Sequence, residues 1–217
     1  MDLKDRDLNI YIRELSSPED DLLKELDRKT NLCSTQPRML SGHIQGKILQ
    51  MLIKMLDPKR ILEIGTFTGY SAICMAQAMS EESLLYTIDI NDELSYIAEE
   101  FFIRSGLSDK IDYRIGNALK IAPELNKTFD LVYMDGDKRE YPQYYRMLMD
   151  NNLLHSNSFI LADNILWDGK VTDNSPKTLK DTYTAGIKEF NETVRNDSRV
   201  EVVILPIRDG MSIIRVK

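Results

Sequence analysis

The sequence is poor in cysteine and histidine, with two residues of each among its 217. Cys33 and Cys74 lie far apart and lack the spacing of a metal site. The opening stretch MDLKDRDLNIYIREL has no apolar centre of the kind found in a signal peptide. We therefore expect free thiols and a cytoplasmic protein.

Long apolar runs and an excess of positive charge are also missing. No apolar run approaches the roughly 20 residues that cross a bilayer. Lys and Arg number 28 against 35 Asp and Glu, so the formal net charge is -7. We therefore expect neither a nucleic acid nor a membrane as a partner, and the composition favours a small molecule.

The N-terminal quarter of the chain has helical periodicity. Apolar residues recur at helical spacing in 7–15, 17–30 and 42–56, and Ser17 before Pro18 is the expected N-cap of the second helix. At 42% hydrophobic residues the chain can bury one sizeable core. We expect residues 1–57 to form a helical segment that packs on a main domain of residues 58–217, within a single structural domain.

From residue 60 onward, short β-rich runs alternate with longer amphipathic ones. Strands are expected near RILEIG, LLYTIDI, KIDYRIG, FDLVYMD and SFILADN, with helices between them. This alternation predicts an α/β fold with a doubly wound, mostly parallel sheet. The final runs VEVVILPI and GMSIIRV flank the turn signal RDG, which predicts a hairpin that adds an antiparallel strand.

A glycine-containing turn follows the first predicted strand, in ILEIGTFTGYS. Gly65 ends the strand and Gly69 precedes a helix, so a nucleotide-like ligand can approach the backbone here. Asp89 ends the next strand, where a doubly wound fold places an acid against ribose hydroxyls. The alternative is that the glycines only turn the chain and Asp89 is an exposed strand-end residue. The GxxxG spacing lacks the GxGxxG pattern of a dinucleotide site.

Acidic side chains end two later strands. Asp135 follows the fourth predicted strand, and Asp163 with Asn164 ends the fifth. Neighbouring strands lie about 4.8 Å apart, so these groups can share an ion. Oxygen ligands suit a hard cation such as Mg²⁺ and argue against Zn²⁺. The alternative, which spacing alone leaves open, is that these acids cap helices or pair with Lys138 and Arg139.

The stretches LEIGTFTGYS, TIDI, GNA, DGDK and DNILWDGKV, taken together, resemble the cation-dependent class I O-methyltransferases that use S-adenosylmethionine. This group includes catechol and caffeoyl-coenzyme A O-methyltransferases, and the resemblance runs from about Met39 to the C-terminus. It implies a Rossmann-like methyltransferase fold with a seven-stranded sheet whose last strand is antiparallel. It also implies two cofactors, S-adenosylmethionine and a divalent cation, which is Mg²⁺ or else Ca²⁺ or Mn²⁺.

The resemblance further implies the roles of individual residues. The expected contacts of S-adenosylmethionine are Met39, Ser41, Glu63, Gly65, Phe67, Ser71, Asp89, Asn117, Ala118, Asp135 and Asp137. The expected metal ligands are Asp135, Asp163 and Asn164. Lys138 is the expected catalytic base and touches the substrate, and Trp167 stands beside the substrate entrance, although packing of its loop on the sheet is an equal alternative.

Two further features have open interpretations. Tyr141, Tyr144 and Tyr145 surround Pro142 and are predicted to pack rather than to bind a ligand. Asp209 and Gly210 match a C-terminal pair of the family but also fit a simple hairpin turn. Phe67 stands where many relatives carry Tyr, and Gly136 where many carry Ala or a larger residue.

The implied activity is methyl transfer to a hydroxyl of a catechol-like or caffeoyl-type aromatic acceptor, by an enzyme expected to be a homodimer. One alternative is a catalytically silent module that binds S-adenosylmethionine and acts through a partner. The presence of Asp135, Lys138, Asp163 and Asn164 together disfavours it. A second alternative, a nicotinamide-dependent dehydrogenase, is opposed by the GxxxG spacing. The identity of the acceptor is not readable from the sequence.

Overall fold

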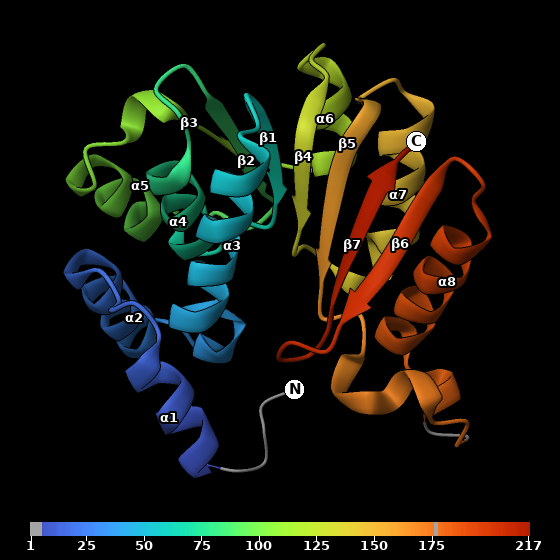
Figure 1. The fold of residues 1–217 in the computed structure, drawn as a ribbon, viewed down its shortest axis with the longest axis horizontal. Coiled ribbons are helices and arrows are strands. Elements are labelled where there is room, and N and C mark those ends of the chain that lie inside the picture. Colours follow the sequence, from blue (N-terminus) through green and yellow to red (C-terminus); the bar gives the residue numbers. More distant parts are fainter. Residues whose placement is uncertain (1–5, 176–177) are drawn as a thin grey trace. The chain divides into compact units, whose positions relative to one another are not determined.

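The computed structural model describes residues 6–175 and 178–217. The chain divides into two compact units, of which one ends at Gly116 and the other begins at Asn117 (Figure 1).

The first unit contains three parallel strands and five α-helices. Its strands are β1 (Arg60–Ile64), β2 (Leu84–Asp89) and β3 (Ile111–Ile115), in the order β3-β2-β1. Its helices are α1 (Arg6–Leu15), α2 (Asp21–Cys33), α3 (Gly42–Leu56), α4 (Tyr70–Ala78) and α5 (Ser95–Arg104), with short 3-10 turns η1 (Pro37–Met39) and η2 (Ser108–Lys110). Helices α3 and α4 lie side by side (Figure 1).

The predicted N-terminal helices are present, but the predicted N-cap of the second one is wrong. Helix α2 begins at Asp21, and Asp20 caps it by accepting the backbone N–H of Leu22 at 2.9 Å. Ser17 stays outside the helix because its carbonyl oxygen lies 2.8 Å from Nε2 of His43. A contact distant in sequence therefore moves the helix start by one turn.

The second unit contains the remaining four strands. They are β4 (Phe129–Met134), β5 (Leu154–Asp163), β6 (Val200–Leu205) and β7 (Met211–Val216), in the order β4-β5-β7-β6. Its helices are α6 (Ala118–Glu124), α7 (Tyr141–Asp150) and α8 (Thr182–Asn196), with 3-10 turns η3 (Lys138–Glu140), η4 (Trp167–Thr172) and η5 (Thr178–Lys180). Strands β4 and β5 are parallel, whereas β7 runs antiparallel to both β5 and β6, so the predicted terminal hairpin is confirmed.

The burial of a strand depends on its place in the sheet. Strands β1, β2 and β4 are almost continuously buried, as expected for parallel strands covered on both faces. The edge strand β6 instead exposes Val202, Val203 and Ile204. Cys33 is exposed, Cys74 is buried, and both are free thiols as predicted. Within the described residues, no helix is both long and apolar enough to span a membrane.

Candidate active site

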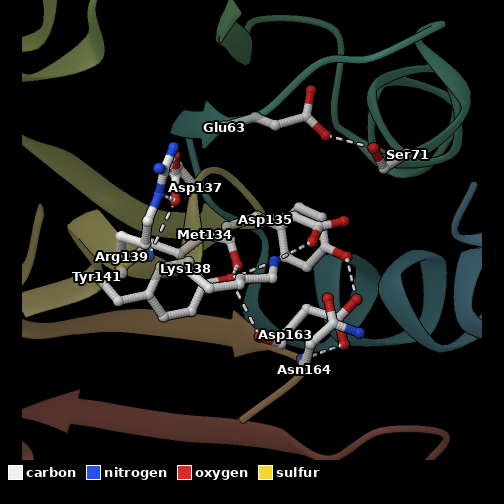
Figure 2. Close-up of polar contacts among 11 residues, drawn as sticks. Glu63, Ser71, Met134, Asp135, Asp137, Lys138, Arg139, Tyr141, Asp163 and Asn164 are labelled. Carbon is white, nitrogen blue, oxygen red and sulfur yellow. Dashed lines mark hydrogen bonds and ion pairs between the residues drawn. The ribbon is translucent and has the colours of Figure 1, made fainter. Parts of the chain in front are cut away.

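The carboxyl ends of β4 and β5 bring two acidic residues together. Met134 pairs with Ala162 in the parallel register, so the next residues, Asp135 and Asp163, leave the strands side by side. The Asp163 side chain is buried, and its Oδ1 accepts the backbone N–H of Asn164 at 2.8 Å. The predicted placement of Asp135, Asp163 and Asn164 at one edge is confirmed (Figure 2).

Lys138 lies directly on this acidic pair. Its Nζ donates to Asp135 Oδ1 at 2.7 Å and to the hydroxyl oxygen of Tyr141 at 2.8 Å, and only 7% of the residue is exposed. Burial raises the pKa of the Asp135 carboxyl, the ammonium of Lys138 opposes this, and the negative charge of Asp163 adds to it. The cluster therefore holds a partly buried ion pair with a second, buried carboxylate beside it.

Tyr141 is a residue of the site that sequence reasoning missed. Its side chain packs, as predicted, because it is fully buried and meets Phe190 edge to face. Its hydroxyl oxygen also lies 2.8 Å from the carbonyl oxygen of Met134 and 3.0 Å from that of Asp163, and it accepts from Lys138 (Figure 2). Burial raises the pKa of Tyr141 well above its ordinary value, so it remains a neutral donor that ties both strand ends to Lys138.

Asp137 faces Arg139 and not the acidic pair. It caps η3 by accepting the backbone N–H of Arg139 at 2.9 Å and forms an ion pair with its guanidinium. The alternative for the strand-end acids, pairing with a neighbouring cation, holds for Asp135, which pairs with Lys138. Asp137 was predicted to touch the cofactor, and its contact with a cofactor stays a prediction.

The oxygen donors at this edge fit a hard cation. Asp135 and Asp163 offer carboxylates, and Asn164 offers a side-chain amide. Asn164 has a φ of 58°, so the backbone leaves the extended strand conformation at this residue. Among residues 6–175 and 178–217, no three or more His, Cys, Asp or Glu side chains are grouped to hold a metal ion. Any cation here would thus be held by two carboxylates and one amide, a donor set that suits Mg²⁺ better than Zn²⁺.

In the first unit, the turn after β1 is built around the carboxylate of Asp89. Gly65 has a φ of 103°, which a side chain would disfavour, and its N–H donates to Ile88 at 2.8 Å. The backbone N–H of Phe67 donates to Asp89 Oδ2 at 2.6 Å. At Gly69 an added Cβ would lie 2.7 Å from the ring of Phe102, so this glycine allows the turn to close.

A buried carboxylate lies behind this turn. Glu63 is fully buried, and its two oxygens accept the hydroxyls of Ser71 and Thr87, each at 2.5 Å. Thr87 and Thr66 also share a hydrogen bond of 2.6 Å. Glu63 thus links the turn, the start of α4 and strand β2, and Thr66 and Thr87 join the network although sequence reasoning did not single them out.

Four other predicted cofactor contacts lie at the starts of helices or just before them. Met39 ends η1 and is 55% exposed, whereas Ser41 precedes α3 and is buried. In the second unit, Asn117 caps α6 by accepting the N–H of Leu119 at 2.8 Å, and Ala118 is the first residue of that helix. All four remain predictions as ligand contacts.

Trp167 lies in the loop after β5. Its ring stacks on Tyr183 with centroids 5.8 Å apart, and Lys170 Nζ lies 5.6 Å from its centroid. The Arg139 guanidinium also lies over the ring of Tyr183, with its Cζ 4.8 Å from the ring centroid. The indole Nε1 is buried and has no hydrogen-bond partner. The loop-packing interpretation therefore accounts for the ring, and its role toward a substrate stays a prediction.

Comparison with known proteins decides the family. A family model described as O-methyltransferase matches residues 13–217. The chain belongs to this O-methyltransferase family. It is 32% identical to caffeoyl-CoA O-methyltransferase 1 of Arabidopsis thaliana, across 98% of this chain and 85% of that protein. It is also 32% identical to catechol O-methyltransferase of Niastella koreensis, across 95% of each.

Solved methyltransferase structures share the fold. The SAH-bound methyltransferase PaMTH1 of Podospora anserina has a TM-score of 0.89 at 26% identity, with 97% of this chain and 94% of that chain covered. An O-methyltransferase of Bacillus cereus in complex with SAH has a TM-score of 0.88 at 27% identity, with 97% of each chain covered. The predicted fold class, an α/β fold with a seven-stranded, mostly parallel sheet and an antiparallel last strand, is confirmed.

Proposed function

We propose that this O-methyltransferase moves a methyl group from S-adenosylmethionine to a hydroxyl of a catechol-like or caffeoyl-type aromatic acceptor, assisted by a divalent cation and Lys138. The observation that carries the proposal is the cluster in which the partly buried Asp135 meets the buried side chains of Lys138, Tyr141 and Asp163. The names of the Arabidopsis and Niastella relatives support the acceptor class, and the SAH-bound neighbours support the methyl donor.

In this proposal Asp135, Asp163 and Asn164 hold the cation. The donor chemistry fits, because two carboxylates and an amide leave octahedral positions for water and for an acceptor with two adjacent oxygens. When bound, the cation supplies Lewis acidity, which lowers the pKa of an acceptor hydroxyl. Asp163 is held for this role by the Asn164 N–H, and both strand ends are held by the hydroxyl of Tyr141.

In this proposal Lys138 takes the proton of the acceptor hydroxyl at Nζ as a neutral amine, so the ammonium that pairs with Asp135 in this structure would first release one proton to solvent. Its side chain is held in position by two hydrogen bonds at Nζ, one to Asp135 and one to Tyr141. Nζ also lies 4.8 Å from the centre of the Tyr141 ring. A base held in one position contributes through orientation as well as through proton transfer. Lys138 is the first residue of the short turn η3, which follows β4.

The first unit carries most of the residues proposed to bind the donor. When bound, S-adenosylmethionine supplies the methyl group as a sulfonium. Gly65 leaves room for close approach to the backbone, and the Phe67 N–H fixes the Asp89 carboxylate in advance of any ribose contact. Ser71 is engaged by Glu63, so we propose that Glu63 and Ser71 act by holding the turn in shape.

The test is a methyl-transfer assay with catechol, caffeate, caffeoyl-coenzyme A and a flavonoid, each with Mg²⁺ and with a chelator. We expect transfer with Mg²⁺ only, and Asp163→Ala should abolish it while the dissociation constant of S-adenosylmethionine changes little. Lys138→Ala should lower turnover far more than it weakens donor binding. Equal transfer with chelator would refute the cation, and donor binding without any transfer would favour a catalytically silent module.

Assembly and location also belong to the proposal. Ile10, Tyr11 and Leu15 of α1 are exposed apolar side chains, which supports a homodimer. Light scattering coupled to size-exclusion chromatography tests this, and a monomer mass would refute it. The cytoplasmic location expected from the free thiols stays a prediction.

A further inference from the structure

The segment that follows β5 has an unusual backbone. Four of the six residues 164–169 have positive φ, namely Asn164 at 58°, Trp167 at 48°, Asp168 at 53° and Gly169 at 76°. Residues other than glycine rarely adopt such angles, and a run of them persists only where neighbouring structure holds it. This segment carries a proposed metal ligand at one end and the only tryptophan of the chain near the other.

The turn of the β6–β7 hairpin holds this segment at three points. The carbonyl oxygen of Gly210 accepts from Ile165 N at 3.2 Å, and that of Asp209 accepts from Leu166 N at 2.9 Å. The side chain of Asp209 then accepts the backbone N–H of Asp168 at 2.7 Å. The turn itself closes through a separate bond from Gly210 N, so the Asp209 carboxylate is not needed to form it.

Two further contacts show that the fit is tight. Asn191 of α8 donates from Nδ2 to the carbonyl oxygen of Ile165 at 3.0 Å, so that residue is held on both of its backbone groups. An added Cβ at Gly210, whose φ is 85°, would lie 2.4 Å from Cγ of Leu166. The absence of a side chain at Gly210 therefore allows the hairpin turn to lie directly against the segment.

We propose that Asp209 is a positioning residue, which holds the segment 164–169 in its left-handed backbone and thereby orients Asn164 and Trp167. The inference deepens the proposed function, because these residues are the proposed cation ligand and substrate wall. It assigns to the Asp-Gly pair of the hairpin a role beyond turning the chain. Asp209 touches neither donor nor acceptor in this role and acts through the backbone N–H of Asp168.

The single tryptophan gives a direct test that needs neither metal nor substrate. In Asp209→Ala the segment loses a charge-assisted hydrogen bond, which we expect to raise the population of displaced conformers about tenfold. The emission of Trp167 should shift to the red, and its acrylamide quenching constant should rise by about twofold or more, as expected for a locally opened loop. Asp209→Asn keeps an acceptor oxygen and should restore the wild-type emission and quenching.

Asp197→Ala is the matched control. Asp197 likewise accepts the backbone N–H of a residue shortly after a structural element, Arg199, at 2.9 Å, but it lies at the end of α8. Asp197→Ala should lower the free energy of unfolding without changing the acrylamide quenching of Trp167. If Asp209→Ala fails to fold, Asn191→Ala decides the matter, because it releases Ile165 from the other side and should raise quenching in the same direction.

The functional readout is the affinity for Mn²⁺, measured on the donor-free protein by the paramagnetic signal of the free ion. We expect the dissociation constant to rise about tenfold in Asp209→Ala and to recover in Asp209→Asn. Unchanged quenching in folded Asp209→Ala, or equal quenching in the Ala and Asn variants, would overturn the inference. Changed quenching without methyl transfer by any variant would leave the positioning role in place and refute the proposed function alone.

Discussion

Gly186 on α8 determines how closely that helix approaches the turn carrying Lys138. A Cβ added at Gly186 would lie 2.4 Å from the carbonyl oxygen of Lys138 and 2.9 Å from Cα of Arg139. Ordinary contact begins at 3.4 Å, so the turn or the helix must shift by about 1 Å, which is 3.4 less 2.4. Both atoms belong to backbone, which cannot rotate away as a side chain would.

The expected effect of Gly186→Ala on activity is larger than its effect on stability. Overpacking costs about 1–3 kcal/mol, and the better helix propensity of alanine offsets roughly 1 kcal/mol of this. The free energy of unfolding should therefore fall by only about 0–2 kcal/mol. A 1 Å displacement of a catalytic group can cost about a hundredfold in rate, so turnover should fall about 10- to 100-fold.

The assay compares kcat at saturating donor, acceptor and Mg²⁺ with urea unfolding of the same preparations. Gly46→Ala is the matched control, because it is also a helical glycine whose added Cβ would be too close to a neighbour, here 2.6 Å from Cys74 Sγ. Gly46→Ala should lose stability and keep turnover. If folded Gly186→Ala turned over within about twofold of wild type, the placement of Lys138 by α8 would be refuted.

Two other substitutions test the second unit. Tyr141→Phe removes the hydroxyl that binds Lys138 and both strand ends, and it should lower the free energy of unfolding by about 1–3 kcal/mol together with turnover; unchanged urea unfolding and kcat would contradict this. Hydrogen bonding from Arg199, aided by Tyr145 and opposed by burial, lowers the pKa of Asp197 to about 2. Because the pKa of Asp197 is lower in the folded than in the unfolded protein, its carboxylate stabilises the fold above the unfolded-state pKa near 4, and this stabilisation is lost as the pH falls toward 2. Asp197→Asn should therefore lower the free energy of unfolding by about 1 kcal/mol at pH 7, a value reduced for solvent screening because the Arg199 side chain is half exposed. Near pH 2 the substitution should cost almost nothing. A urea-unfolding series from pH 7 to pH 2 measures it, and a constant difference would contradict the assignment.

The fold was predictable because its signals are local. Strands β1, β2 and β4 are mostly apolar runs, and the change from helical to strand periodicity near residue 60 is visible without any tertiary information. The positions of Asp135 and Asp163 follow from the same pattern, since the end of a buried strand fixes where the next side chain emerges. Topology then brings the two ends together.

The parts that were missed depend on contacts distant in sequence. The N-cap of α2 is Asp20 because Ser17 is bound by His43 and Glu19 accepts the hydroxyl of Tyr70, and both partners lie on other helices. A stretch such as SPEDD offers several residues able to cap, and local propensity does not choose among them. The choice is made by tertiary contacts that the stretch does not encode.

Tyr141 and Gly186 were missed for the same reason. A tyrosine in an amphipathic helix is most often a packing residue, and only the path of β4 and β5 brings two carbonyl oxygens to its hydroxyl. A glycine in a helix normally only weakens it, and its use as a point of close approach depends on where η3 lies. Sequence patterns thus located the carboxylates but not the groups that hold Lys138 beside them.

The carboxylates of Glu63 and Asp135 accept hydrogen bonds from different kinds of donor, and this difference bears on their roles. Glu63 accepts hydrogen bonds from the hydroxyls of Ser71 and Thr87, which are short, uncharged side chains on a helix and a strand. Asp135 accepts a hydrogen bond from the ammonium of Lys138, and the Asp163 carboxylate lies beside it. Glu63 is thus bound by uncharged hydroxyl donors, whereas Asp135 is bound by a cationic group of the kind that takes part in proton transfer. This difference fits a structural role for the carboxylate in the turn after β1 and agrees with the chemical role proposed for the carboxylate at the end of β4.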